Sequence, residues 1–188
     1  MISAATQTLA NFIAQGGSSP LIEKEHISFE HPQIKPLVQP NLNLYCYDLQ
    51  PSNRKPFKFN SYTGIIAYDS YKLAQPLSTL CHWFELTFLI SACDHTALGE
   101  QRILSDVLQL LASYSCLPES CLATPFKGYQ MPIKASVATA NDPIQLWQAF
   151  QAPLKCALHV TLTVPMFQQV SSSVAKPLAS PSVLSTTI

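Results

Sequence analysis

Residues 82–114 read HWFELTFLISACDHTALGEQRILSDVLQLLASY and contain the two clearest patterns of the chain. The first pattern alternates between two faces, and one face is apolar throughout: Phe84, Leu86, Phe88, Ile90 and Ala92. Because the opposite face is also partly apolar, the pattern predicts a central strand. The second pattern has helical spacing and predicts an amphipathic helix that buries Ile103, Leu104, Val107, Leu108, Leu111 and Tyr114. Asp94 or Thr96 is expected to cap its first turn.

Weaker patterns lie on the N-terminal side of this unit. Residues 2–15 predict a helix that the following GGSSP ends, with a buried side made of Ile2, Leu9, Phe12 and Ile13. Residues 22–32 predict a modest strand. Residues 41–49 predict a half-buried strand, because apolar and polar or aromatic side chains alternate from Leu42 to Tyr47. Residues 50–80 predict a loop followed by a strand or hairpin arm, and a loop of this length is usually functional or mobile.

The C-terminal side predicts three further elements. Residues 131–139 predict a strand, and Asn141 or Asp142 is expected to cap a short helix that begins at Pro143. That helix carries Trp147 and Phe150. The chain breaks at Pro153 and then predicts a closing strand whose inward side chains are Leu158, Val160, Leu162 and Val164.

This order of elements predicts an α+β domain over residues 1–167, with a single mixed or antiparallel sheet flanked by two or three helices. Residues 168–188 are rich in Ser, Thr and Pro and contain one charged residue, Lys176. Such a segment cannot bury enough apolar surface to fold alone. It is either a frayed tail or an arm that a neighbouring subunit orders, and truncation at Gln168 is expected to weaken assembly and leave the fold intact.

The charge content limits the kinds of protein that this chain can be. Charged residues make up 12% of it, against roughly 25% in an average soluble domain, and the eleven basic and eleven acidic residues cancel. A chain so poor in charge tends to associate, so we expect an assembly to cover its surface. No stretch reaches the ~20 apolar residues of a membrane span, and residues 1–17 do not resemble a cleavable signal. Nucleic-acid binding is not expected, because the only basic cluster is Arg54, Lys55 and Lys58.

The sequence lacks the usual motifs of catalysis and cofactor binding. None of its six cysteines forms a Cys-x-x-Cys pair, so zinc is poorly supported and reduced thiols in the cytoplasm are expected. Two nucleophile pairs are conceivable, Cys81 with His82 and Cys121 with His159, but Cys81 and His82 are adjacent on a strand and point to opposite faces. Glu85 could be a general acid or base, although pairing with a lysine or a backbone amide is the expected role. We therefore expect no enzyme, no metal and no cofactor.

Four stretches carry a resemblance to a known family: the early helix with ISFEHP, then PNLNLYCYDL, residues 84–118, and residues 142–165. In this order the chain resembles the N-terminal domain of the tube-terminator, or cap, proteins of contractile phage-tail-like injection systems, a family long known only as a domain of unknown function. The resemblance spans roughly residues 1–167. It departs from the family before the central strand, where Asn53-Arg54 and QPLSTLCHW replace an arginine-asparagine pair and a proline-proline-leucine run.

The resemblance implies a tail-terminator-like fold and a structural role. The chain would form a hexameric ring on the distal end of the inner tube, stop its polymerisation and join it to the last sheath layer. Its partners would be further copies of itself, the inner tube protein and the sheath protein, in the cytoplasm as part of a phage-tail-like particle. Trp147 and Phe150 would pin the short helix to the sheet.

Two other functions stay open. The chain could be an adaptor at the baseplate or anchor side of a tail-like assembly, or a small soluble ligand-binding domain or enzyme. Partner contacts are expected in the loop of residues 50–80 and in the tail, because both are long and lack a core pattern. The candidate contact residues are Arg54, Lys55, Phe57, Lys58, Phe59, Tyr62, Gln168, Val170, Val174 and Lys176.

Overall fold

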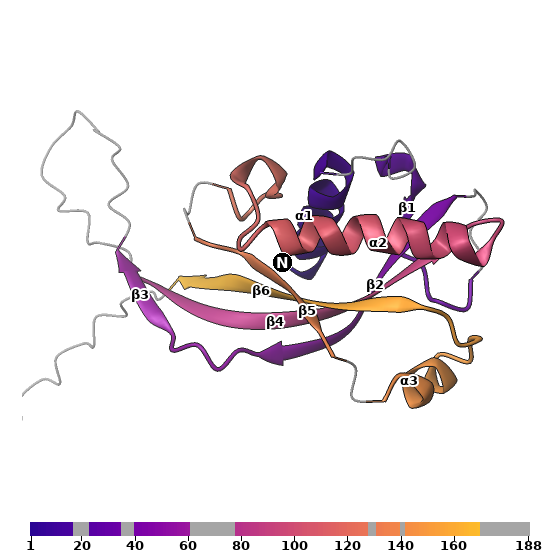
Figure 1. The fold of residues 1–188 in the computed structure, drawn as a ribbon. Coiled ribbons are helices and arrows are strands. Elements are labelled where there is room, and N and C mark those ends of the chain that lie inside the picture. The colour runs from indigo at the N-terminus through magenta and orange to yellow at the C-terminus, as the bar shows by residue number, and fades with distance from the viewer. Residues whose placement is uncertain (17–22, 35–39, 61–77, 128–130, 140–141, 170–188) are drawn as a thin grey trace, which may run out of the picture.

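The computed structural model describes residues 1–16, 23–34, 40–60, 78–127, 131–139 and 142–169 (Figure 1). Its centre is strand β4, Ser78–Cys93, which pairs antiparallel with β2, Asn41–Pro51, on one side and with β6, Ala157–Gln169, on the other. The shorter strands are β1, Ile27–Ser28, parallel to β2; β5, Lys134–Ala138, antiparallel to β6; and β3, Phe57–Asn60, antiparallel to the start of β4. They form one mixed sheet in the order β1-β2-β4-β6-β5, with β3 beside β4.

Helices lie on both faces of this sheet (Figure 1). Helix α1, Ile2–Gly16, and helix α2, Ala97–Ser113, cover one face, which we call the core face. The short helix α3, Pro143–Ala149, lies on the opposite face, which we call the outer face. Two short 3₁₀-helices, η1 at Lys24–His26 and η2 at Glu119–Cys121, lie in the connections. The predicted α+β fold with a single mixed sheet and flanking helices is therefore confirmed.

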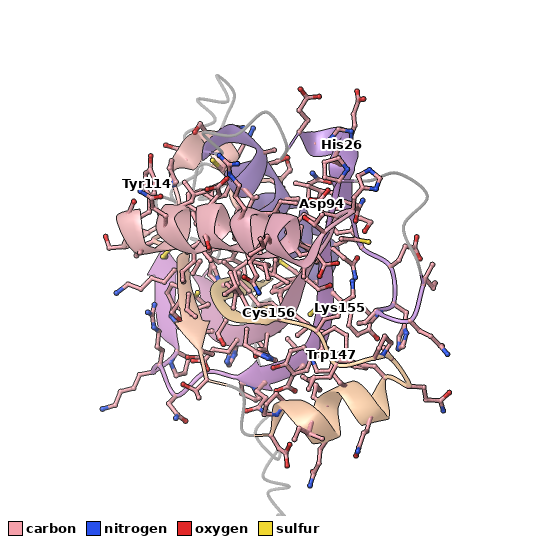
Figure 2. All side chains as sticks on the ribbon, turned by 45° about the vertical axis from the view of Figure 1, so that its right-hand side comes forward. His26, Asp94, Tyr114, Trp147, Lys155 and Cys156 are labelled. Atoms are coloured by element: carbon pink, nitrogen blue, oxygen red, sulfur yellow. The ribbon has the colours of Figure 1, made fainter. Side chains whose placement is uncertain are left out.

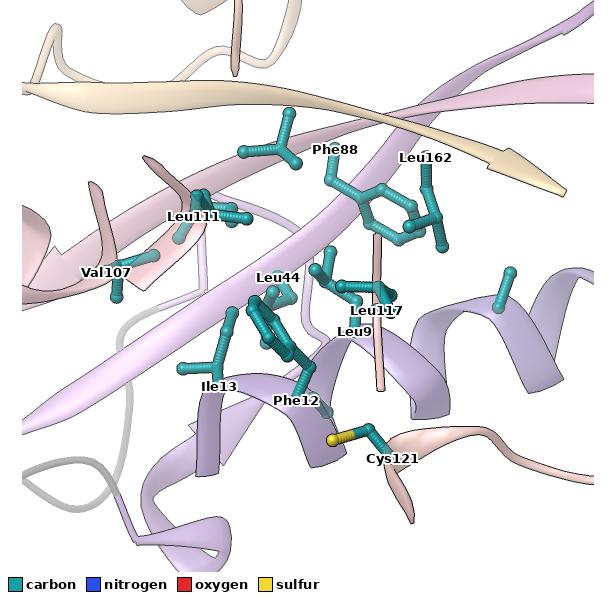
Figure 3. Packing of buried hydrophobic residues seen from close by; sticks show 14 of the residues in the cluster. Leu9, Phe12, Ile13, Leu44, Phe88, Val107, Leu111, Leu117, Cys121 and Leu162 are labelled. Atoms are coloured by element: carbon teal, nitrogen blue, oxygen red, sulfur yellow. The ribbon is translucent and has the colours of Figure 1, made fainter. Parts of the chain in front are cut away.

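The core face is apolar because alternate residues of the three long strands point toward α1 and α2. Phe12 of α1, Phe88 of β4 and Leu162 of β6 are almost completely buried there. Figure 3 shows further members of the same cluster: Leu9, Ile13, Leu44, Val107, Leu111, Leu117 and Cys121. Each large apolar side chain buried in this way contributes roughly 1.5–3 kcal/mol, which makes this cluster the main source of stability.

The starts of α2 and α3 show which of the proposed caps is used. Thr96 Oγ1 accepts a hydrogen bond from the Gly99 backbone N–H at 3.0 Å, so Thr96 rather than Asp94 caps α2. Asp142 Oδ1 accepts one from the Gln145 backbone N–H at 3.0 Å and caps α3. Asn141 lies outside the described residues.

Several details of the predicted burial are wrong. In α2, Leu108 is 42% exposed and Leu110 is 9% exposed. Leu108 points away from the sheet, whereas the buried residues of α2 point toward it. Tyr114 follows the helix and is exposed, although its ring packs edge-on against Phe12 at 5.4 Å. Ile2 is exposed rather than buried, because it begins α1 where nothing covers the helix among the described residues.

Two predicted elements also differ from the structure. Residues 22–32 contain η1 and the two-residue β1 instead of a longer strand, and most of the GGSSP segment lies outside the described residues. The loop predicted from residue 50 contains β3, and residues 61–77 lie outside the described part.

Candidate interaction surface

Two segments that were predicted to contact partners meet at one end of the sheet. The loop residues Phe57, Lys58 and Phe59 form β3, and Lys58 pairs with Leu80 at the start of β4. On the other side of β4, Gln168 of β6 pairs with the same Leu80. Because neighbouring strands lie about 4.8 Å apart, the backbones of Lys58 and Gln168 lie about 10 Å apart.

We call this region the β3 end of the sheet, made of Phe57–Asn60, Ser78–Cys81 and Met166–Gln169. In Figure 1 it is the left-hand end, where the strands extend beyond α2. The sequence predicts each segment separately, and only the sheet register brings the two together. The remaining candidates, Tyr62, Val170, Val174 and Lys176, lie outside the described residues.

The connection between β2 and β3 is fixed to β4 by three contacts. The Ser52 backbone N–H donates to the Trp83 carbonyl at 2.9 Å, and the Ser52 hydroxyl donates to Glu85 Oε1 at 2.7 Å. The Arg54 guanidinium lies over the Trp83 ring, 4.8 Å from its centroid, at a distance typical of a cation–π contact. Arg54 is thus held against the sheet, whereas Lys55 is exposed.

Glu85 was expected to pair with a lysine or a backbone amide, and that expectation is wrong. Its partner is the Ser52 hydroxyl, because the outer face of β4 at this point lies under the turn that leaves β2. A carboxylate that accepts a hydrogen bond from a turn serine fixes that turn. The arrangement gives Glu85 a structural role.

An apolar hollow lies on the core face next to the β3 end. It has a volume of about 700 Å³ and is lined by Met1, Ile2, Ser3, Leu49, Phe84, Leu86, Val164 and Met166. Ile2 is 49% exposed and Leu49 is 45% exposed, so large aliphatic side chains face solvent here. The hollow is the place where the apolar face of the three long strands continues past the first turn of α1. Sequence reasoning did not find it, because no local pattern joins α1 to β2.

The outer face carries a cluster of aromatic rings that attaches α3. The Phe150 ring makes edge-on contacts with His31, Tyr45, Tyr47 and Trp147, at centroid distances of 5.5, 5.5, 6.3 and 6.5 Å. Trp147 is only 3% exposed, and Figure 2 shows it on the side of α3 that faces the sheet. The prediction that Trp147 and Phe150 pin this helix to the sheet is confirmed.

A buried histidine pairs with a tyrosine beside this cluster. The Tyr47 hydroxyl oxygen lies 3.1 Å from His159 Nδ1, at hydrogen-bonding distance. Tyr47 occupies a bulge in β2, where the register with β4 shifts between Cys46 and Asp48. Burial lowers the pKa of His159 and raises the pKa of Tyr47, so both side chains are neutral at pH 7.

The two cysteine–histidine pairs considered as nucleophiles are not formed. The Cys121 thiol donates to Gln15 Oε1 at 3.1 Å, while His159 lies against Tyr47. The Cys81 thiol contacts the backbone carbonyl of His82 at 3.9 Å, and burial raises the pKa of the thiol, which disfavours the thiolate. These side chains take part in packing.

Among the described residues, no group of three or more histidine, cysteine, aspartate or glutamate side chains is arranged to hold a metal ion. No helix in the described ranges has both the length and the apolar character needed to cross a bilayer.

Comparisons with known proteins give a consistent family and fold. A family model described as the Pvc16 N-terminal domain matches residues 4–180. The structure of the sheath/tube terminator of an extracellular contractile injection system, PVC, in the extended state aligns with a TM-score of 0.59 and 12% sequence identity, covering 100% of this chain and 64% of that one. The tube-terminating cap of the anti-feeding prophage, AFP, aligns with a TM-score of 0.50 and 15% identity, covering 100% of this chain and 60% of that one.

The structural likenesses at these identities show the fold, and this chain spans less than two thirds of either matched chain. No curated protein matches the sequence. The family match includes nearly all of the four stretches on which the resemblance to terminator domains rests, and that resemblance is confirmed.

Proposed function

The chain belongs to the family of Pvc16 N-terminal domains, and from that membership we propose that it ends the growth of a tube in a contractile injection assembly. The family match over residues 4–180 carries the proposal. The two solved structures that share the fold support it, since they are described as a sheath/tube terminator and a tube-terminating cap. The role is structural rather than catalytic.

In the proposed arrangement, six copies close a ring on the distal end of the inner tube and join it to the last sheath layer. The partners are the chain itself, the inner tube protein and the sheath protein, within a phage-tail-like particle that is assembled in the cytoplasm. The low charge content supports burial in such an assembly, because only 12% of the residues are charged. A domain over residues 1–167 would form the body of each subunit, and residues 168–188 its arm.

The contacts of potentially reactive side chains support the structural role. His159 is paired with Tyr47, Cys121 with Gln15, and Glu85 with Ser52. Each of these groups forms a hydrogen bond with a neighbouring element of the fold. The β3 end is the part of the sheet that we propose for partner contacts.

Deletion in a strain that makes the particle tests the proposal. Negative-stain images are expected to show tubes of uncontrolled length or particles that lack a cap, and expression of the full chain should restore a uniform length. Capped particles of normal length in the deletion strain would contradict the proposal. A labelled copy seen at the baseplate end would instead favour the adaptor function.

A pair of variants tests whether the turn that leads to the β3 end takes part in the contact surface. Replacing Arg54 and Lys55 together by alanine should reduce the restoration of uniform tube length, because both lie in the turn that leads to β3. Lys134→Ala is the matched control, since this exposed lysine lies on β5 at the opposite edge of the sheet. Equal restoration by both proteins would move the contact surface away from this turn.

A further inference from the structure

The apolar hollow is an unfinished part of the core. Phe84, Leu86 and Val164 form its floor on neighbouring strands, and Ile2 and Leu49 form exposed parts of its rim. Among the described residues, nothing covers it. Contiguous apolar surface of this kind usually marks an interaction site on a soluble protein.

The segment that follows β6 has the chemistry to fill such a hollow. Residues 170–188 contain one charge, Lys176, and six aliphatic side chains: Val170, Val174, Leu178, Val183, Leu184 and Ile188. Small hydroxyl residues separate them, so the segment carries apolar groups but no core of its own. Fully extended, it could reach about 60 Å, compared with a diameter of about 40 Å for a domain of this size.

The direction of β6 favours a contact with another subunit. Met166 lines the hollow, so a segment that returned to the hollow of the same chain would have to reverse direction directly after Gln169. Gly, Asn and Asp, which two-residue hairpin turns favour most, are absent from residues 170–176, although three serines are present. The end of β6 points past the hollow of its own subunit, so a contact with the hollow of another copy needs no such reversal.

We infer that the hollow of one copy binds aliphatic side chains from residues 170–188 of a second copy. The inference rests on the proposed ring and names one of its contacts. A closed ring of identical subunits needs two different complementary patches on each subunit, and the hollow and the segment form such a pair. The lining of the hollow is almost entirely aliphatic or aromatic, which matches the nearly uncharged segment.

A photo-crosslinking amino acid in place of Leu49 of the full chain tests this contact. After irradiation of the purified protein and of recovered particles, a dimer-sized adduct is expected, and peptide mass spectrometry should locate the second attachment within residues 170–188. The same amino acid in place of Val137, exposed on β5, is the control and should not capture this segment. A monomer-sized adduct, attachment elsewhere, or no adduct overturns the inference.

A charge substitution adds an independent measurement. Leu49→Glu should weaken self-association, measured by sedimentation, by at least about tenfold. A tenfold change corresponds to about 1.4 kcal/mol. Val137→Glu should leave it unchanged, and circular dichroism checks that both variants fold. Rings that form without the cross-link to residues 170–188 would refute this contact and leave the proposed function standing. Capped particles in the deletion strain would refute the function instead.

Discussion

Replacement of Trp147 by alanine tests whether the aromatic cluster holds α3 on the outer face. Trp147 is 3% exposed, and removal of a side chain of this size from a packed site costs about 3–5 kcal/mol. Helix α3 has seven residues, too few to be stable by itself, so its position depends on the rings that it buries. The helix can detach without unfolding the core face, so we expect a loss at the lower end, about 3 kcal/mol.

Urea unfolding followed by circular dichroism measures this loss directly. A loss of about 3 kcal/mol lowers the Tm of a chain of this size by about 6–12 °C. Hydrogen exchange should show faster exchange of the backbone amides of α3 than of β4. These two readouts separate detachment of the helix from unfolding of the sheet.

Ile144→Ala is the matched control, because Ile144 lies on the same helix and is 58% exposed. Its free energy of unfolding should change by less than about 0.5 kcal/mol. If Trp147→Ala lost less than about 1 kcal/mol and left the exchange of α3 unchanged, the cluster would not be what attaches the helix.

Three further measurements test single contacts. The folded pKa of His159 is below its unfolded value of about 6.5, so its contribution to the free energy of unfolding is fully present above pH 6.5 and is lost as the pH falls through the folded pKa. The loss is at most about 1.4 kcal/mol per pH unit. Urea midpoints between pH 5 and 8 should show this, and His159→Gln should flatten the profile. Thr96→Ala removes the cap of α2 and should cost about 1 kcal/mol in the same assay, whereas a neutral result would mean that water replaces the cap. Lys155→Met breaks the 2.8 Å ion pair with Glu100 and should cost less than about 1 kcal/mol, since both groups are partly exposed; a larger loss would mean that the pair is coupled to the fold.

The long elements could be predicted from the sequence because their patterns repeat. β4 alternates over its whole readable length, and α2 returns apolar residues to one side every three or four positions. Leu108 was misplaced because a leucine beside the stripe fits the period almost as well as Leu110 does. Only the position of the sheet decides which of the two is buried.

The surface features depend on contacts between distant segments, which no local pattern reports. β3 is four residues long, and its pairing with β4 defines it more than its own sequence does. His31 meets Phe150 only because the segment that follows β1 lies beside β2, whose Tyr45 contacts both rings. The candidate contact segments lack a core pattern, and their meeting at Leu80 follows from strand register.

The outermost strands of the sheet are short: β1 has two residues and β5 has five. A long edge strand with unpaired backbone groups allows one molecule after another to pair with it, as in fibres. A protein that is proposed to stop the growth of a tube should offer no such template to further copies of itself. The brevity of β1 and β5 reduces the main chain that either outermost strand offers to a further copy, which is one way in which natural sheets limit edge-to-edge growth.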